Sequence, residues 1–177
     1  MNFLNPYLNY FYNPIVINKD YLQKQLSILE DSLNKITTYD EEFFIVDTSD
    51  FNIWKPESTY VSSIGFRHMY YSDKTLRDFY SRVHQDDLEL IVDCFLKNSV
   101  KLIEKQPKKY LNDVIIKSTY RYKNKWNRYV FIIEQVKYLK IDNKGKPELL
   151  LFKLSPVDNY LISKVSTSIK VLNKEKV

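Results

Sequence analysis

Few residues of this chain have the chemistry of a catalytic or metal site. The two histidines, His68 and His84, are candidate ligands for haem or a metal ion, because imidazole binds both. His84 directly precedes Gln85-Asp86-Asp87 at the expected start of a helix, so it is interpreted as a helix cap. His68 lies in an irregular segment, where a lone histidine is ordinarily structural or solvated. Neither histidine therefore predicts a metal or haem site.

The cysteine and the paired carboxylates also have structural interpretations. Cys94 is the only cysteine, so no internal disulfide can form, and its position inside an amphipathic pattern makes it a small apolar residue. Asp86 and Asp87 stand at the positive end of a helix dipole, and adjacent residues there do not converge on a substrate. With only Gly65 and Gly145, the chain has no phosphate-binding loop. We predict no enzyme and no cofactor.

The composition fits one globular domain of 177 residues. Residues 1–96 hold 8 Lys and Arg against 15 Asp and Glu, whereas residues 97–177 hold 19 against 7. The basic half is either a surface for nucleic acid or an acidic partner, or a solvated face of strands with alternating lysines. The second reading is favoured, because the basic residues are spread over several strands and turns. No apolar run approaches the roughly 20 residues of a spanning helix. We predict a cytoplasmic protein without membrane contact.

A helix is predicted over residues 19–36, with Asn18 or Asp20 as its cap. Its apolar residues are spaced alternately four and three apart, as in a short coiled-coil seam. These residues are Leu22, Leu26, Leu29, Leu33 and Ile36. The seam can pair with its twin in a homodimer or lie on the domain's own sheet, and both alternatives remain open. A homodimer through this helix is our prediction.

The rest of the chain predicts an antiparallel sheet with helices. Short strands are expected at 42–47 and 51–54, small helices at 58–64 and 73–80, and a long helix at 86–104. Longer strands follow at 114–123, 128–141 and 149–154, with a hairpin turn at 142–147. The strand at 128–141 is apolar on both faces near its middle, which indicates that its outer face is covered too. The N-terminal helix is the candidate for that cover.

This order resembles the PAS fold, an α+β fold in which helices cover one face of a five-stranded antiparallel sheet. His84-Gln85-Asp86-Asp87 stands where one type of PAS domain has His-Pro-Asp-Asp, and Tyr120-Arg121 matches the Tyr-Arg strand of that type. The chain is similar to sensory PAS domains that precede LuxR-type helix-turn-helix regions in regulators of Bacteroidetes. Two features depart from the pattern: Asn124-Lys125-Trp126 replaces an expected glycine, and Val157-Asp158-Asn159 only loosely matches a closing Asp-Ile-Thr.

The resemblance implies three regions and a regulatory role. Residues 1–37 would be an N-terminal extension with the amphipathic helix, 38–160 the PAS domain, and 161–177 a linker-like tail toward a missing output domain. The chain would be the signal-input region of a LuxR-type transcriptional regulator. DNA would be bound by the missing C-terminal domain, with no direct nucleic-acid contact by this region. Cys94 lacks the sequence context of flavin-binding PAS domains, so flavin is not expected.

A ligand pocket is predicted between the helices and the sheet. Its candidate lining residues are Trp54, Phe95, Ser118, Tyr120, Tyr122 and Ile133. A small apolar or aromatic molecule would bind there, unless these side chains simply fill the core. Two alternatives remain: a ligand-free interaction module that docks an acidic partner, and a small α+β enzyme of the ketosteroid-isomerase type. We argue against the enzyme because none of the six positions is a carboxylate.

Overall fold

The computed structural model describes residues 12–15, 17–33, 41–54, 75–124, 126–157 and 165–171. The helices are α2 (Lys19–Leu33), α3 (Leu76–Tyr80), α4 (Gln85–Lys105) and the 3-10 helix η3 (Lys108–Asp113). The strands are β1 (Glu42–Asp47), β2 (Ile53–Trp54), β3 (Val114–Lys123), β4 (Tyr129–Ile141), β5 (Pro147–Pro156) and β6 (Ser166–Val171). The small helix predicted at 58–64 lies outside the described residues.

These strands form one antiparallel sheet in the order β2-β1-β5-β4-β3-β6. The predicted α+β fold is confirmed: strands β1 to β5 make the expected five-stranded sheet, helices cover one of its faces, and an amphipathic helix precedes it. The hairpin turn between β4 and β5 is also as predicted, with Gly145 at a φ of 84°.

The sixth strand corrects the prediction that residues 161–177 form a linker-like tail. Residues 166–171 pair with β3, in a register that places Ile116 opposite Ile169. Two physical reasons favour the strand. The segment Ser166-Thr167-Ser168-Ile169-Lys170-Val171 is half β-branched, and an unpaired β3 edge would expose its N–H and C=O groups.

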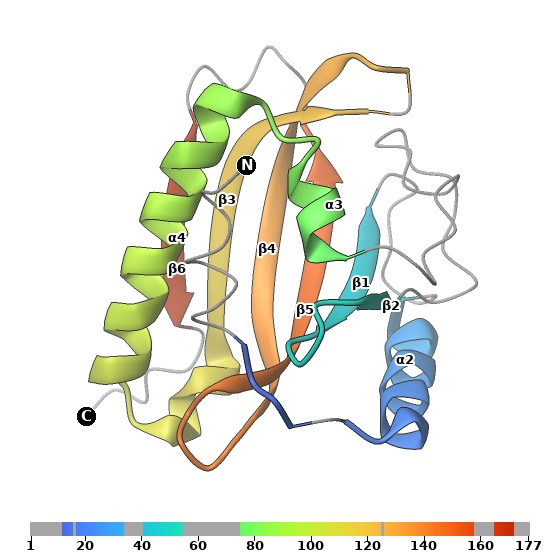
Figure 1. Cartoon of the computed structure of the whole chain (residues 1–177), viewed down its shortest axis with the longest axis vertical. Helices are drawn as coiled ribbons and strands as arrows, with labels where there is room; N and C mark the ends of the chain where they lie inside the picture. The colour runs from blue at the N-terminus through green and yellow to red at the C-terminus, as the bar shows by residue number, and fades with distance from the viewer. Residues whose placement is uncertain are drawn as a thin grey trace.

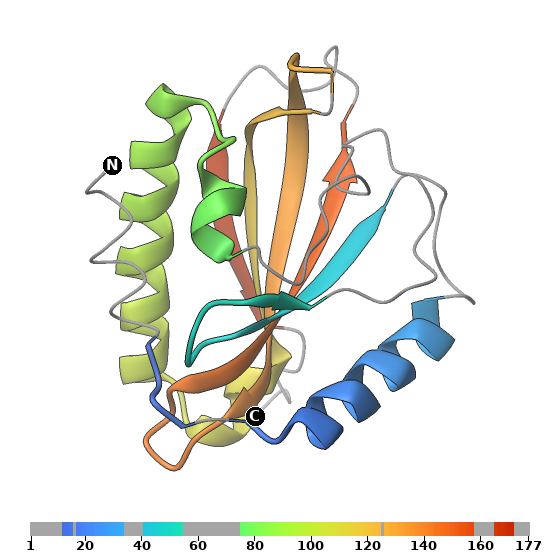
Figure 2. The ribbon, with the colours of Figure 1, turned by 45° about the vertical axis from the view of Figure 1, so that its right-hand side comes forward.

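Helices lie on both faces of the sheet. Helices α3 and α4 pack on the face that we call the inner face, and α2 packs on the opposite, outer face. Figure 1 shows α4 along the β3 and β6 side, α3 over the middle, and α2 beside β1. Figure 2 shows the same separation of α2 from α4 after a turn of the molecule.

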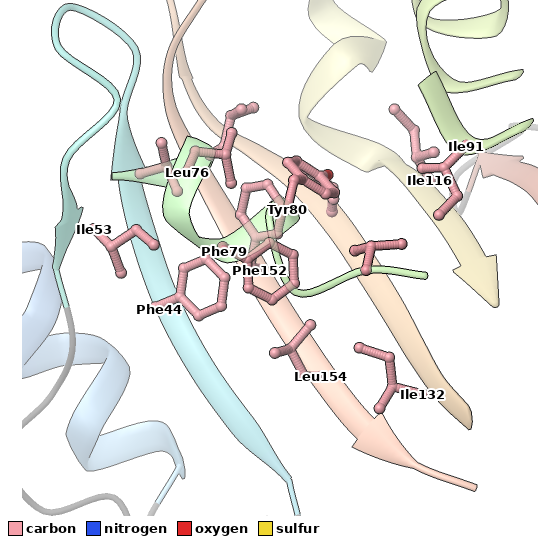
Figure 3. Close-up of a cluster of buried hydrophobic side chains, with 14 of the residues drawn as sticks. Phe44, Ile53, Leu76, Phe79, Tyr80, Ile91, Ile116, Ile132, Phe152 and Leu154 are labelled. Atoms are coloured by element: carbon pink, nitrogen blue, oxygen red, sulfur yellow. The ribbon is translucent and has the colours of Figure 1, made fainter. Parts of the chain in front are cut away.

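Large aromatic side chains fill the inner face around α3. The rings of Phe44 and Phe152 stack at 4.9 Å between centroids, and Phe79 of α3 lies 5.6 Å from Phe44 (Figure 3). Phe79 also stacks on Tyr122 at 5.2 Å. A chain without alanine must build its core from such side chains, and here they pack closely against one another.

Helix α2 rests on the outer face, where it packs over β1 and β5 and, of the β4 residues, with Leu139. The prediction that it covers the middle of β4, around Ile133, is therefore wrong. The Asn18 side chain caps it, since Asn18 Oδ1 accepts a 2.8 Å hydrogen bond from the Asp20 backbone N–H. Leu22 and Leu26, 2% and 6% exposed, pack with Ile45 and Leu149. The leucine seam was expected either to pair with its twin or to pack on the chain's own sheet. Leu22 and Leu26 pack on the sheet. The side chains of Leu29 and Leu33, and the whole of Ile36, lie outside the described part.

Helices in the described part of the chain are all too short or too polar to cross a membrane.

Candidate functional site

A buried carboxylate at the centre of the sheet is the most unusual group on the inner face. Glu134 lies in the middle of β4 between Ile132 and Val136 in the inward-facing alternation, and it is 0% exposed. Its Oε2 accepts a 2.8 Å hydrogen bond from the Tyr120 hydroxyl of β3. The Tyr80 hydroxyl, at the end of α3, donates to Oε2 at 3.2 Å and Oε1 at 3.3 Å. We call these three residues the Glu134 cluster.

Burial decides the protonation of Glu134. Removal from water raises the pKa of Glu134 to about 7, although the hydrogen bonds from Tyr120 and Tyr80 lower it. Among the described residues no lysine, arginine or histidine forms an ion pair with Glu134. Both the neutral and the charged forms are therefore populated near neutral pH.

The cluster belongs to a row of polar groups that crosses the inner face. Ser118 of β3 is directly opposite Glu134, and Leu154 of β5 is opposite it on the other side. Leu154 is in turn opposite Glu42 of β1, which is 1% exposed. The backbones of Glu134 and Glu42 are thus two strand spacings apart, roughly 10 Å. This row is the polar part of a face that is otherwise apolar.

A second polar contact joins the two halves of the PAS-like motif. Arg121 Nε and the Arg121 backbone N–H both donate to Asp87 Oδ2, at 2.9 and 2.8 Å, and Arg121 Nη2 donates to Oδ1. Burial of Asp87 tends to raise its pKa, but the hydrogen bonds and charge of Arg121 outweigh that effect and hold it below its usual value. Asp87 thereby fixes the start of α4 to β3.

His84 has the capping role that was predicted for it. Its Nδ1 accepts a 3.3 Å hydrogen bond from the Asp86 backbone N–H, and its carbonyl accepts the first helical bonds from Asp87 and Leu88. The His84 backbone N–H donates to the Arg121 carbonyl at 2.9 Å. Within the described residues, no group of three or more His, Cys, Asp or Glu side chains is placed to hold a metal ion.

The predicted pocket residues divide between the two faces of the sheet. Ser118, Tyr120 and Tyr122 are buried on the inner face, as expected. The prediction is wrong for Ile133, which is opposite Thr119 and so points to the outer face. It is also wrong for Trp54, which is opposite Ile45 and packs on the outer face with the apolar side chains beneath α2.

Both errors have a physical cause. The strand around Ile133 is apolar on its two faces, so apolarity could not tell them apart. Strand β2 is only two residues long, too short for an alternation pattern to place Trp54. The Phe95 side chain lies outside the described part. Tyr122 stacks on Phe79, and its burial strongly raises its pKa, so this candidate lining residue serves as core packing.

Sequence reasoning missed Glu134 and Tyr80. A signal for Glu134 was present, because a single acid interrupts the apolar run Val130-Phe131-Ile132-Ile133-Glu134 at the same parity as Ile132. The argument against an isomerase-like enzyme considered six positions that contain no carboxylate, and Glu134 is not one of them. Glu134 supplies the raised-pKa carboxylate required of an isomerase-like enzyme, although at 0% exposure a substrate does not reach it in this structure.

Comparisons with known proteins give likenesses of fold alone. No protein-family model matches the sequence. No curated protein matches it. One similar solved structure is the N-terminal domain of a diguanylate cyclase with a PAS/PAC sensor from Marinobacter aquaeolei, at 16% identity over 66% of this chain and 94% of that one, with a TM-score of 0.42.

Two further structures show the same level of similarity. A sensory box histidine kinase/response regulator from Burkholderia thailandensis is 12% identical over 75% of this chain and 86% of that one, with a TM-score of 0.44. An RNA-binding light-oxygen-voltage receptor is 10% identical over 72% of this chain and 31% of that one, with a TM-score of 0.39. At these sequence identities and TM-scores, the similarity is limited to the fold.

Proposed function

We propose that this chain is a PAS-type signal-input region that responds to a small molecule bound against the inner face of its sheet. One observation carries the proposal: Glu134 is fully buried, yet it is hydrogen-bonded from both β3 and α3. Burial of a carboxylate without a cation costs several kcal/mol relative to an apolar side chain of similar volume. Ionisable groups placed at such a cost are concentrated at functional sites.

The position of Tyr80 gives the cluster a means of reporting a signal. Tyr80 is the last residue of α3, a helix of only five residues, and Tyr120 lies on β3, which also receives the start of α4 through Arg121. A ligand group that replaces either tyrosine hydroxyl at Glu134 would change how α3 is attached to the sheet. Small shifts of a packed element become discrete changes, because cores do not deform continuously.

Finer features of this proposal rest on the resemblance of the motif at residues 84–87 and 120–121. The region would belong to a cytoplasmic LuxR-type transcriptional regulator, with DNA bound by a separate C-terminal domain. It would act as a homodimer. Since Leu22 and Leu26 are occupied by the chain's own sheet, the dimer would not use them as its seam.

Native mass spectrometry of protein purified from its own host tests ligand and subunit number together. We expect a small-molecule adduct on each chain, a dimeric mass, and loss of the adduct in Glu134→Gln. The matched control is Glu89→Gln, an exposed carboxyl-to-amide change on α4, which should keep the adduct. Wild-type protein whose mass equals that of the bare polypeptide would contradict ligand sensing.

The link to an output domain has a separate test. An antibody raised against this chain should detect, in the native host, a product larger than the 21.3 kDa of these 177 residues. A native product of 21.3 kDa would contradict the regulator assignment while leaving ligand binding unaffected.

The Glu134 cluster also supports a second candidate, acid–base catalysis on a small substrate. A carboxyl group with a pKa of about 7 can take or give a proton at neutral pH, and the two phenols can donate to a developing oxyanion. The adduct seen by mass spectrometry separates the two functions. A sensor returns its ligand unchanged, whereas an enzyme converts it, and the conversion stops in Glu134→Gln.

A further inference from the structure

Part of the outer face, on β3 and β4, carries lysines and no acidic residue of these two strands. On β3 and β4 the outward side chains include the apolar Ile115, Phe131 and Ile133 and the basic Lys117 and Lys137, five residues that we call the outer patch. No outward-facing residue of β3 or β4 is acidic, because the only acid in either strand is the inward Glu134. The outer patch is therefore apolar and positively charged.

The residues that the structure describes leave this patch partly accessible. Lys117 is exposed, and the other four residues are half-buried. None of the three apolar residues belongs to either core cluster. Helix α2 packs over β1 and β5, and in both views it lies on the β1 side of the sheet, away from β3 (Figures 1 and 2).

The lysines of the patch differ from the neighbouring lysines in their ion pairing. Lys153 pairs with Glu41 at 2.6 Å, and Lys140 pairs with Glu148. In the described part of the chain, neither Lys117 nor Lys137 has an ion-pair partner. Since Lys117 is opposite Gln135, Lys117 and Lys137 are diagonal neighbours, about 7–8 Å apart. Their charges thus reinforce each other beside apolar surface.

We propose that the outer patch binds an acidic amphipathic helix of a partner protein. From Phe131 to Lys137 the patch runs about 20 Å along β4, which matches nearly four turns of an α-helix. The partner's apolar stripe would cover Phe131 and Ile133, and its carboxylates would meet the two lysines.

The charge and apolarity of the outer patch also disfavour two other occupants, a second copy of this chain and a nucleic acid. A second copy of this chain, packed face to face through the same patch, would bring four lysines together without a carboxylate between them. A nucleic acid would satisfy the lysines but would leave Ile115 and Ile133 against a polar backbone. Neither occupant matches the apolar and the charged parts of the patch at once. The proposal concerns the outer face and does not rest on a ligand at Glu134.

A designed peptide tests the outer patch directly. The probe is a helical peptide of about 20 residues with leucines along one face and glutamates along its flanks, and the control peptide has lysine at every glutamate position. Binding to the full chain is measured by fluorescence anisotropy at about 0.05 and 0.5 M salt. We expect binding of the glutamate peptide, weakened by salt, and none of the lysine peptide.

Three variants locate the site. Lys117→Glu combined with Lys137→Glu should weaken binding at least about tenfold, and Phe131→Ser should weaken it without changing the salt dependence. Lys144→Glu, an exposed charge reversal in the β4–β5 turn, should leave binding unchanged. Circular dichroism checks that each variant is folded.

Four results would overturn the proposal. Equal affinity of the double variant for the glutamate peptide would place binding elsewhere, and absence of binding by folded wild-type protein would remove the acidic helix as occupant. Tighter binding of a DNA or RNA duplex at the same lysines, or a dimer that Phe131→Ser dissociates in sedimentation, would assign the patch to a nucleic acid or to a second copy.

Discussion

Asp87 and Arg121, 34 residues apart in the sequence, are joined by hydrogen bonds from both the guanidinium and the backbone N–H of Arg121. Asp87 begins α4 and Arg121 lies near the end of β3, so the pair holds the long helix to the sheet. Asp87 and Arg121 belong to the two motifs, at residues 84–87 and 120–121, on which the resemblance to PAS domains rests. The two motifs are separate in the sequence, but in the structure they contact each other through this pair.

Removal of the Arg121 side chain should destabilise the fold. Arg121→Ala leaves a buried Asp87 carboxylate with only its backbone donor, which we expect to lower the free energy of unfolding by about 2–3 kcal/mol. Urea denaturation at neutral pH measures the change. Arg128→Ala, an exposed arginine in the β3–β4 connection, is the control and should stay within about 0.5 kcal/mol of wild type. A similar loss in both variants would contradict the role of the pair.

Glu134 should make the protein less stable as the pH rises toward neutrality. The unfolded chain loses the Glu134 proton near pH 4.5, whereas the folded protein keeps it to about pH 7. Between these values the folded state binds the extra proton, so the free energy of unfolding falls as pH increases, by about 3 kcal/mol in all. Glu134→Gln removes this slope.

Denaturation between pH 5 and about pH 8 measures that slope, with Glu89→Gln as the exposed control. Burial also raises the pKa of Asp47, which contributes in the same direction, so the difference between wild type and Glu134→Gln isolates Glu134. The lowered pKa of Asp87 acts at more acidic pH, outside this window. Parallel curves for wild type and Glu134→Gln would refute a titrating Glu134.

The two tyrosines should shift the Glu134 titration to different extents. Both hydroxyls stabilise the carboxylate, so Tyr120→Phe and Tyr80→Phe should each raise the pKa of Glu134 further. The effect should be larger for Tyr120, whose hydrogen bond is 2.8 Å, than for Tyr80, whose bonds are 3.2 and 3.3 Å. Carbon NMR of the labelled carboxyl group follows each titration. Tyr129→Phe, an exposed site, should leave the midpoint unchanged, and a lower midpoint in Tyr120→Phe would contradict the geometry.

The alternation of polar and apolar residues correctly predicted which face a side chain lies on where one face of a strand is polar. It gave the wrong face where both are apolar. Lys117 and Arg121 mark one face of β3, and this correctly placed Ser118, Tyr120 and Tyr122 on the other. β4 has apolar residues on both sides, with Phe131 and Ile133 outward and Ile132 and Val136 inward, so its pattern could not place Ile133. Glu134 was missed for a related reason: its environment depends on Tyr80, 54 residues away, which no local pattern connects to it.

Strand β6, at one edge of the sheet, was also not predicted from the sequence. In β6 the β-branched Thr167, Ile169 and Val171 alternate with Ser166, Ser168 and Lys170, but the run is short and lies in a polar segment, so the sequence predicted a linker. Its stability comes from backbone hydrogen bonds to β3, which depend on tertiary position rather than on side-chain pattern. The helix at 19–33, in contrast, was predicted together with its cap, because both signals are local.

The leucine seam of α2 provides the test that separates folding from dimerisation. Leu26 is buried against the sheet of its own chain, so Leu26→Asp should place a charge beside Ile45 and Leu149 and lower the free energy of unfolding by about 3 kcal/mol or more. Thermal unfolding measures the loss, and sedimentation of the folded fraction should show no change in subunit number. Ser27→Asp adds the same charge at an exposed position of the helix and should be nearly neutral. A stable Leu26→Asp chain that changes only from dimer to monomer would instead assign this leucine to the dimer seam.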